Sequence, residues 1–162
     1  MKYSGRKDGL LCFSVSRSEH EMLRWLFGHF PLQASAARSL SRGGAAALRE
    51  ADAWLSEALA DERRAQKSWL LARFGEPPAG EGPVGLQVCP EEAERLLQAA
   101  NELRVGAWHH LGSPGNLDDP AGVETPERLQ WQAIMEIAGI VETVLLAGLH
   151  GCRDGPSGKP PA

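Results

Sequence analysis

The stretch VGLQVCPEEAERLLQAANELRVGAWHHL, from Val84 to Leu111, decides the fold that the sequence predicts. Val84, Leu86 and Val88 alternate with smaller or more polar residues, which is typical of a short strand with one apolar face. Pro90 then stands at a first helical position, and two glutamates follow it, where the positive end of a helix dipole favours negative charge. The stretch therefore predicts a strand that leads directly into a capped amphipathic helix.

The N-terminal part of the chain repeats this arrangement. Residues 9–15 alternate as a second strand, with leucine, phenylalanine and valine on one face. Ser16 and Glu19 then form a capping box at the start of a helix, and Pro31 ends that helix. We therefore expect two strand–helix units, whose strands pair and lie on the helix bundle because two strands alone cannot make an independent sheet.

Two longer helices are predicted in the rest of the chain. Residues 45–74 are rich in Ala, Leu, Glu and Arg, and their length predicts a kink or break near Asp61. Leu48, Ala51, Leu55, Ala58 and Leu59 form one apolar stripe on this helix. Thr125 caps the last helix, residues 126–149, which is apolar on nearly every side. A helix of that kind is usually enclosed by several neighbours.

The predicted fold is therefore mainly α. We expect a bundle of four or five helices with a small two-stranded β ribbon and a central apolar C-terminal helix. Residues 1–150 form a single helical domain in this prediction. Residues 151–162 are rich in Gly and Pro, and we predict that they form a disordered tail.

Composition excludes some classes of function. The 162-residue chain has 17 Lys and Arg against 21 Asp and Glu, a formal charge of −4. This acidic excess argues against autonomous nucleic-acid binding, since phosphate contacts need a basic surface. Glu136 and Glu142 interrupt the longest apolar run and make membrane insertion costly. Residues 1–9 are polar and do not resemble a signal peptide. We therefore expect a cytoplasmic protein that does not enter a membrane.

No motif in the sequence indicates catalysis. The chain has no phosphate-binding glycine loop and no nucleophile motif. His109 and His110 are adjacent, so their rings point about 100° apart on a helix, whereas metal ligation from one helix needs i, i+3 or i, i+4 spacing. We predict no metal, no cofactor and no catalytic residue, and we leave the question of an enzyme open.

The cysteines carry one explicit hypothesis. Cys12, Cys89 and Cys152 form no CxxC motif, which is typical of a reducing compartment. Cys12 and Cys89 fall on the outer face of the predicted ribbon, where a suitable register would bring their thiols towards bridging distance. Cys89 also stands at a helix N-cap, where the dipole favours a thiolate. These two residues are the redox candidates; the alternative is that both are small, half-buried hydrophobic residues.

A polar network is predicted between the last two helices. Asn101 and Arg104 flank the apolar stripe of their helix, and Arg104 is expected to reach Glu136 or Glu142 on the last helix. A structural role for these four residues is our first interpretation. The alternative is a small-molecule site or an active site that uses the same carboxylates at the core.

Three segments resemble a known family. They are GLLCFSVSRSEHEMLRWLF (9–27), VGLQVCPEEAERLLQAANELR (84–104) and ERLQWQAIMEIAGIVETVLLAGL (127–149). Their order, with a helix ending in N-[DE]-x-R and a last helix containing Trp and Leu, resembles the AosR-type family of small helical bacterial proteins. The resemblance covers most of the chain, although residues 33–74 match only in being helical.

The resemblance implies a cytoplasmic regulator of the oxidative-stress response that senses redox state through cysteines and acts on transcription with a sigma factor. Genes of this family tend to lie near the Clp adaptor for N-end-rule degradation, which implies a proteolysis-linked adaptor as a second reading. The family's redox sensing depends on a closely spaced cysteine pair, and this chain has none. No sensor residue is therefore transferred to it.

The sequence thus predicts a non-enzymatic regulatory or adaptor protein that acts through a protein partner, either a sigma factor or a Clp-system component by resemblance. A small-molecule binder or enzyme that uses Glu136, Glu142 and Arg104 is the alternative, and a DNA-binding regulator is a third. The oligomeric state stays open.

Overall fold

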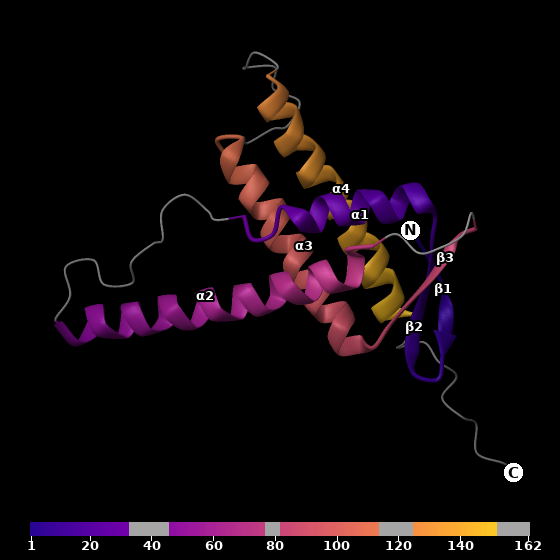
Figure 1. Ribbon diagram of the computed structural model, residues 1–162, viewed down its shortest axis with the longest axis horizontal. Coiled ribbons are helices and arrows are strands. Elements are labelled where there is room, and N and C mark those ends of the chain that lie inside the picture. Colours follow the sequence, from indigo (N-terminus) through magenta and orange to yellow (C-terminus); the bar gives the residue numbers. More distant parts are fainter. Residues whose placement is uncertain (33–45, 77–81, 114–124, 152–162) are drawn as a thin grey trace, which may run out of the picture.

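The computed structural model describes residues 1–32, 46–76, 82–113 and 125–151, with side chains of the second range described from Glu50 onward (Figure 1). Its elements are, in chain order, β1 (Lys2–Lys7), β2 (Leu10–Val15), α1 (Arg17–Gly28), α2 (Ala46–Phe74), β3 (Val84–Val88), α3 (Pro90–His110) and α4 (Pro126–His150). The described part is mainly helical, which confirms the predicted class. Residues 152–162 of the predicted tail, Cys152 among them, lie outside the described residues.

The sheet has three antiparallel strands in the order β1-β2-β3, so the predicted two-stranded ribbon lacked one strand. Asp8 and Gly9 both have positive φ, 50° and 84°, as a tight type I′ hairpin between β1 and β2 requires. The Asp-Gly pair is a strong hairpin signal that we did not use. Strand β1 itself is polar, because it lies at the sheet edge with one side in solvent.

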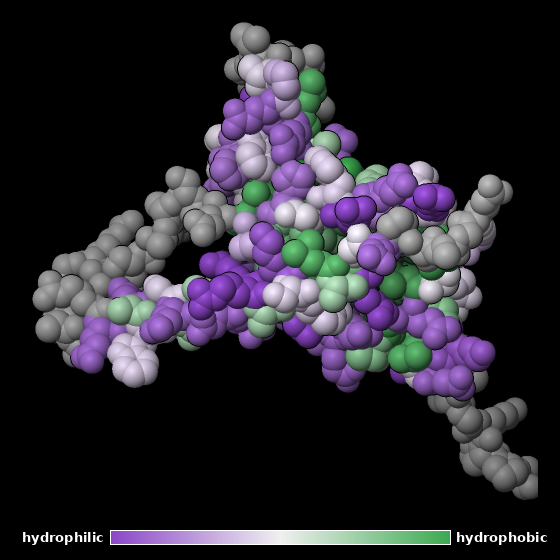
Figure 2. All heavy atoms as spheres, viewed as in Figure 1, coloured by the Kyte–Doolittle hydropathy of each residue, from purple (hydrophilic) through white to green (hydrophobic). Residues whose placement is uncertain are grey.

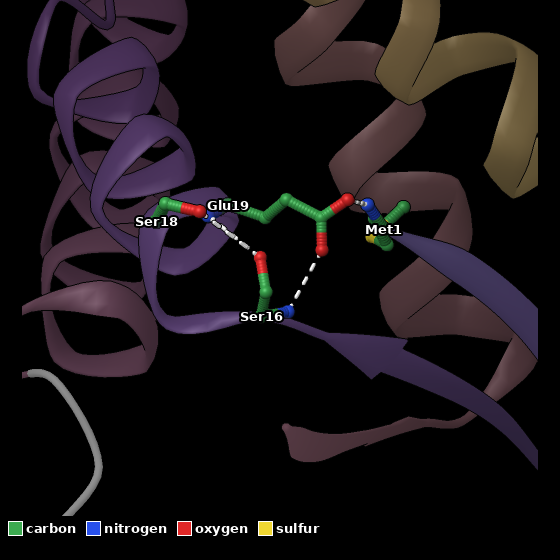
Figure 3. Close-up of polar contacts among 4 residues, drawn as sticks. All are labelled: Met1, Ser16, Ser18 and Glu19. Atoms are coloured by element: carbon green, nitrogen blue, oxygen red, sulfur yellow. Dashed lines mark hydrogen bonds and ion pairs between the residues drawn. The ribbon is translucent and has the colours of Figure 1, made fainter. Parts of the chain in front are cut away.

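The predicted capping box at the start of α1 is confirmed (Figure 3). The backbone N–H of Glu19 donates to Ser16 Oγ at 3.2 Å, and the N–H of Ser16 donates to Glu19 Oε2 at 2.7 Å. The other carboxylate oxygen of Glu19 pairs with the Met1 ammonium. This ammonium, followed by the Ser16 N–H, lowers the pKa of the Glu19 carboxyl below its ordinary value. The charge of Glu19 thus ties β1 to the start of α1.

Helix α2 runs unbroken from Ala46 to Phe74, so the break expected near Asp61 is wrong. The helix contains neither Gly nor Pro, its residues are mostly strong helix formers, and Asp61 pairs with Arg64 one turn later. Only its last third enters the core, through Leu70 and Phe74. In Figure 1 the other end of α2 projects away from the rest of the molecule.

Helices α3 and α4 form the main helix pair and lie side by side in Figure 1. Their predicted caps are confirmed, with Cys89 and Thr125 accepting hydrogen bonds from backbone N–H groups of the first turn. Alanines on both helices allow close packing. Both helices contribute buried residues to the core: Leu96, Ala99, Ala100, Leu103, Ala107, Ile134, Ala138, Val141 and Leu145.

Helix α4 is not enclosed on all sides, which corrects the prediction that it is central. It packs on α3 and on the sheet, whereas Leu129, Ile140 and Leu146 are 48%, 57% and 42% exposed. By length and composition alone α4 is the one described helix that could span a membrane, and 28% of its most apolar 18-residue window is buried. The all-round apolar pattern arose because α4 has few charged residues, not because it has neighbours on every side.

Candidate protein-interaction surface

The register of β2 and β3 does not place the two redox candidates opposite each other. Cys12 pairs with Gln87, and Leu11 pairs with Val88, so Cys89 lies diagonally from Cys12 beyond the end of β3. Diagonal neighbours of this kind have side chains roughly 7–8 Å apart. The Cβ atoms of a disulfide are only about 3.5–4.5 Å apart. Both thiols are half-buried and free.

Cys89 has a structural role at the start of α3. Its Sγ accepts the backbone N–H of Glu92 at 3.4 Å, and its own N–H donates to Glu92 Oε2 at 3.0 Å. A hydrogen bond from the Glu91 backbone, and then one from the Cys89 thiol, lower the pKa of the Glu91 carboxyl. Cys89 thus replaces the serine or threonine that usually fills a capping box.

Three of the four residues of the predicted polar network meet between α3 and α4. Arg104 Nε lies 3.0 Å from Glu142 Oε2, and Arg104 Nη2 donates to Asn101 Oδ1 at 3.2 Å. Glu136 is exposed and, among the described residues, has no ion pair with Arg104. The side chains of Arg104 and Glu142 are 44% and 16% exposed, so the network lies half-buried at the rim of the helix pair instead of in its core. Such an ion pair contributes about 0–1 kcal/mol to stability.

The histidines have separate surroundings. His110 stacks on Trp131 with ring centroids 4.2 Å apart, and His109 Nδ1 lies 3.1 Å from Ser113 Oγ. His29 lies between the carbonyl of Trp25 and the side chain of Gln130. Within the described ranges, no group of three or more His, Cys, Asp or Glu side chains is arranged to hold a metal ion.

The most exposed apolar surface lies on the projecting half of α2, residues 46–62, which we call the arm. From Glu50 to Glu62 every side chain is exposed except the half-buried Asp52. Trp54 is 69% exposed, Leu55 44% and Leu59 46%. At a rise of 1.5 Å per residue the arm is about 25 Å long. An exposed apolar patch of this kind in a folded protein marks either an interaction site or a site prone to aggregation.

The apolar stripe of the arm continues the core-facing side of α2. Leu59, Gln66 and Leu70 follow one another at i+7 and i+4, so they share one helix face. Gln66 donates to the carbonyl of Arg95 and Leu70 is buried, whereas Leu59 is exposed. Arg63, at the foot of the arm, pairs with Glu102 of α3 at 3.0 Å. The same face that packs on the body therefore runs on into solvent beyond Arg63.

The arm is also strongly acidic. Residues 50–62 contain five carboxylates, Glu50, Asp52, Glu57, Asp61 and Glu62, and no Lys or Arg. In Figure 2 the arm shows hydrophilic residues interleaved with pale and green, more apolar ones. It therefore combines an apolar stripe with a negative field. The predicted apolar stripe of Leu48, Ala51, Leu55, Ala58 and Leu59 lies on the arm, and Trp54 was not part of it. The side chain of Leu48 lies outside the described part.

The fold and this surface define a small, mainly α protein with a projecting acidic amphipathic helix. No protein-family model matches the chain, and neither a curated protein nor a solved structure matches it.

Proposed function

We propose that this chain is a non-enzymatic, cytoplasmic regulatory or adaptor protein that binds another protein through the arm of α2. The observation that carries the proposal is the exposure of Leu55 and Leu59 on a continuous helix whose same face is buried further along, with the exposed Trp54 about 100° round the helix from Leu55. Amphipathic helices commonly bind by laying their apolar face into a groove of the partner.

The arm also indicates the chemistry of its partner. A groove that receives Leu55 and Leu59 must be apolar at its floor. Its rim must carry Lys or Arg, because residues 50–62 contain five carboxylates and no Lys or Arg, although Arg64 pairs with Asp61 at the foot of the arm. Association should therefore be faster at low salt and weaken as salt screens these charges.

The resemblance to AosR-type proteins suggests where such a partner is to be sought. A sigma factor in an oxidative-stress response is the first candidate, and a component of the Clp proteolysis system is the second. Each would be recruited through the arm in this proposal.

The alternative of a small-molecule site at the core carboxylates has less support. Glu142 is held by Arg104 at the rim of the helix pair, and Glu136 is exposed on a different side of α4. Their arrangement resembles a surface ion pair more than a pair of carboxylates poised over a substrate.

Site-specific photo-crosslinking tests the proposal. A p-benzoylphenylalanine replaces Trp54 in one version of the protein and Trp25 of α1 in a matched control, and both are irradiated in the source cells. Trp54 is 69% exposed and Trp25 39%, so both positions are accessible. We expect one discrete partner at position 54, absent at position 25, whose yield falls as salt is added to a reconstituted mixture.

Three results contradict the proposal. They are equal crosslinking at both positions, a yield that salt does not change, and a product that contains only a second copy of the chain. The last would make the arm an interface between copies instead of an adaptor surface.

A further inference from the structure

A cavity of about 480 Å³ lies beside β3, far along α2 from the arm. Its walls come from β2, α1, the last turn of α2, β3 and the first turn of α3. Leu23, Phe74 and Leu86 contribute apolar surface, and His20, Arg73 and Glu92 contribute polar groups. Its volume falls within the range of about 300–1,000 Å³ that is usual for small-molecule sites.

His20 is the unusual residue of this cavity. It is only 8% exposed, and its Nδ1 is buried without a hydrogen-bond partner among the described residues. Its ring lies 6.1 Å from that of Phe74, so apolar surface surrounds it on that side. A buried polar group left unpaired costs about 1–3 kcal/mol. Protein folds tolerate few such groups, and they are often found at functional sites.

Arg73 supplies a second nitrogen that has no hydrogen-bond partner among the described residues. Its Nε is buried and, within the described part of the chain, has no partner. Its Nη2 donates to the carbonyl of Gln87 and lies 4.0 Å from Glu92 Oε2, which fixes the guanidinium at the cavity wall. Since Nε of Arg is always a donor, it requires an acceptor.

The geometry favours a compact ligand over an added strand. β3 is an edge strand, and an extended peptide could pair with it in principle. However, Arg73 already occupies the carbonyl of Gln87, which an added strand would need for its ladder. The two unpaired nitrogens belong to residues that line the cavity, and both atoms are themselves buried, so a ligand acceptor that enters the cavity reaches them after a small rotation of the two side chains.

We propose that this cavity binds a small molecule with an apolar body and a carbonyl-type oxygen, which accepts hydrogen bonds from Arg73 Nε and from His20 Nδ1, the imidazole being in its Nδ1–H tautomer. The apolar body lies against Leu23, Phe74 and Leu86. The positive charge of Arg73 is offset by Glu92, so the oxygen belongs either to a neutral amide or to a carboxylate. The proposal is independent of the arm.

Octanoate and octanamide are suitable probes because they share one chain and differ in charge. Octylamine, which has no acceptor oxygen, is the control ligand. Titration followed by ¹H–¹⁵N NMR should give saturable shifts of the amides of Leu23, Phe74 and Leu86 with octanoate, octanamide or both, and not with octylamine. Saturable shifts with octanoate alone indicate a carboxylate ligand, and saturable shifts with octanamide alone indicate a neutral one. Either result supports the proposal.

Two variants assign the binding to the two nitrogens. His20→Phe removes the unpaired nitrogen and should leave stability unchanged or raised, so its fold is not at risk. Arg73→Met removes the second donor, and Arg24→Met, at an exposed position of α1, is its control. We expect at least tenfold weaker binding in the first two and no change in Arg24→Met. Failure of both probes to saturate, equal binding of octylamine, or unchanged binding in His20→Phe overturns the proposal.

Discussion

Two glycines in the main helix pair should respond in opposite ways to the same substitution. A glycine within a helix is less favourable than alanine by about 1 kcal/mol. At Gly139 of α4 an added Cβ would meet only Arg104 Cδ at 3.9 Å, an ordinary contact. Gly139→Ala should therefore stabilise the protein by nearly the full amount, and raise Tm by about 2–4 °C in a chain of this size.

Gly106 of α3 has no room for the same methyl group. An added Cβ would lie 2.6 Å from Leu32 Cβ and 3.4 Å from Leu32 Cδ1. Since Leu32 Cβ is attached directly to the backbone, the segment after α1 must shift. Overpacking of this kind costs about 1–3 kcal/mol, which offsets or exceeds the gain in helix propensity. Gly106→Ala should therefore be neutral to destabilising by about 2 kcal/mol.

Urea unfolding followed by circular dichroism at 222 nm measures both changes. The midpoint of Gly139→Ala should lie above the wild-type midpoint and that of Gly106→Ala at or below it, with similar m values. In a Leu32→Gly background the close contact is absent, so Gly106→Ala should become stabilising. A clear stabilisation by Gly106→Ala in the wild-type background would refute the packing of Leu32 on α3.

Three further predictions use the same unfolding assay or a thiol assay. Because the Met1 ammonium lowers the pKa of Glu19 below 4.5, Glu19→Gln should be less stable than wild type above pH 4.5. That difference should vanish as the pH falls through the lowered pKa, and a constant difference would contradict the ion pair. Glu142→Gln should lower stability by at most about 1 kcal/mol, since its partner Arg104 is 44% exposed; a loss above 3 kcal/mol would indicate a buried pair. After mild peroxide treatment Cys12 and Cys89 should remain two free thiols, because their register is offset; a Cys12–Cys89 disulfide found by mass spectrometry would refute this.

The helices could be predicted because their signals are local. Ser16, Cys89 and Thr125 each cap a helix by a hydrogen bond within three residues, so the sequence alone contains the information. The hairpin at Asp8 was equally local, yet the polar character of β1 concealed it. An edge strand needs few apolar residues, and hydrophobic alternation therefore detects it poorly.

The arm and the outer face of α4 could not be predicted from pattern. Leu55 and Ile140 belong to apolar stripes like those of buried helices, and only the positions of the neighbouring elements leave them 44% and 57% exposed. The sequence of α2 contains no Gly or Pro, and this favours a helix that continues through Asp61 without a break.

The candidate sites depend on contacts between distant residues. Arg104 and Glu142 are 38 residues apart. Their opposite charges on two predicted helices were enough to name Glu142 as one of two expected partners of Arg104. The offset between Cys12 and Cys89 depends on strand register, which short strands do not reveal in sequence. His20 and Arg73 come together only because α1 and α2 meet beside β3.

The affinity of the crosslinked partner for two leucine variants tests the central claim most directly. Leu55 and Leu71 lie on the same helix and are each 44% exposed, but Leu71 lies on the opposite face, outside the arm. The account predicts that Leu55→Glu weakens binding at least tenfold, because it places a charge in the apolar contact, whereas Leu71→Glu leaves the Kd unchanged. Equal Kd values for the two variants would contradict it.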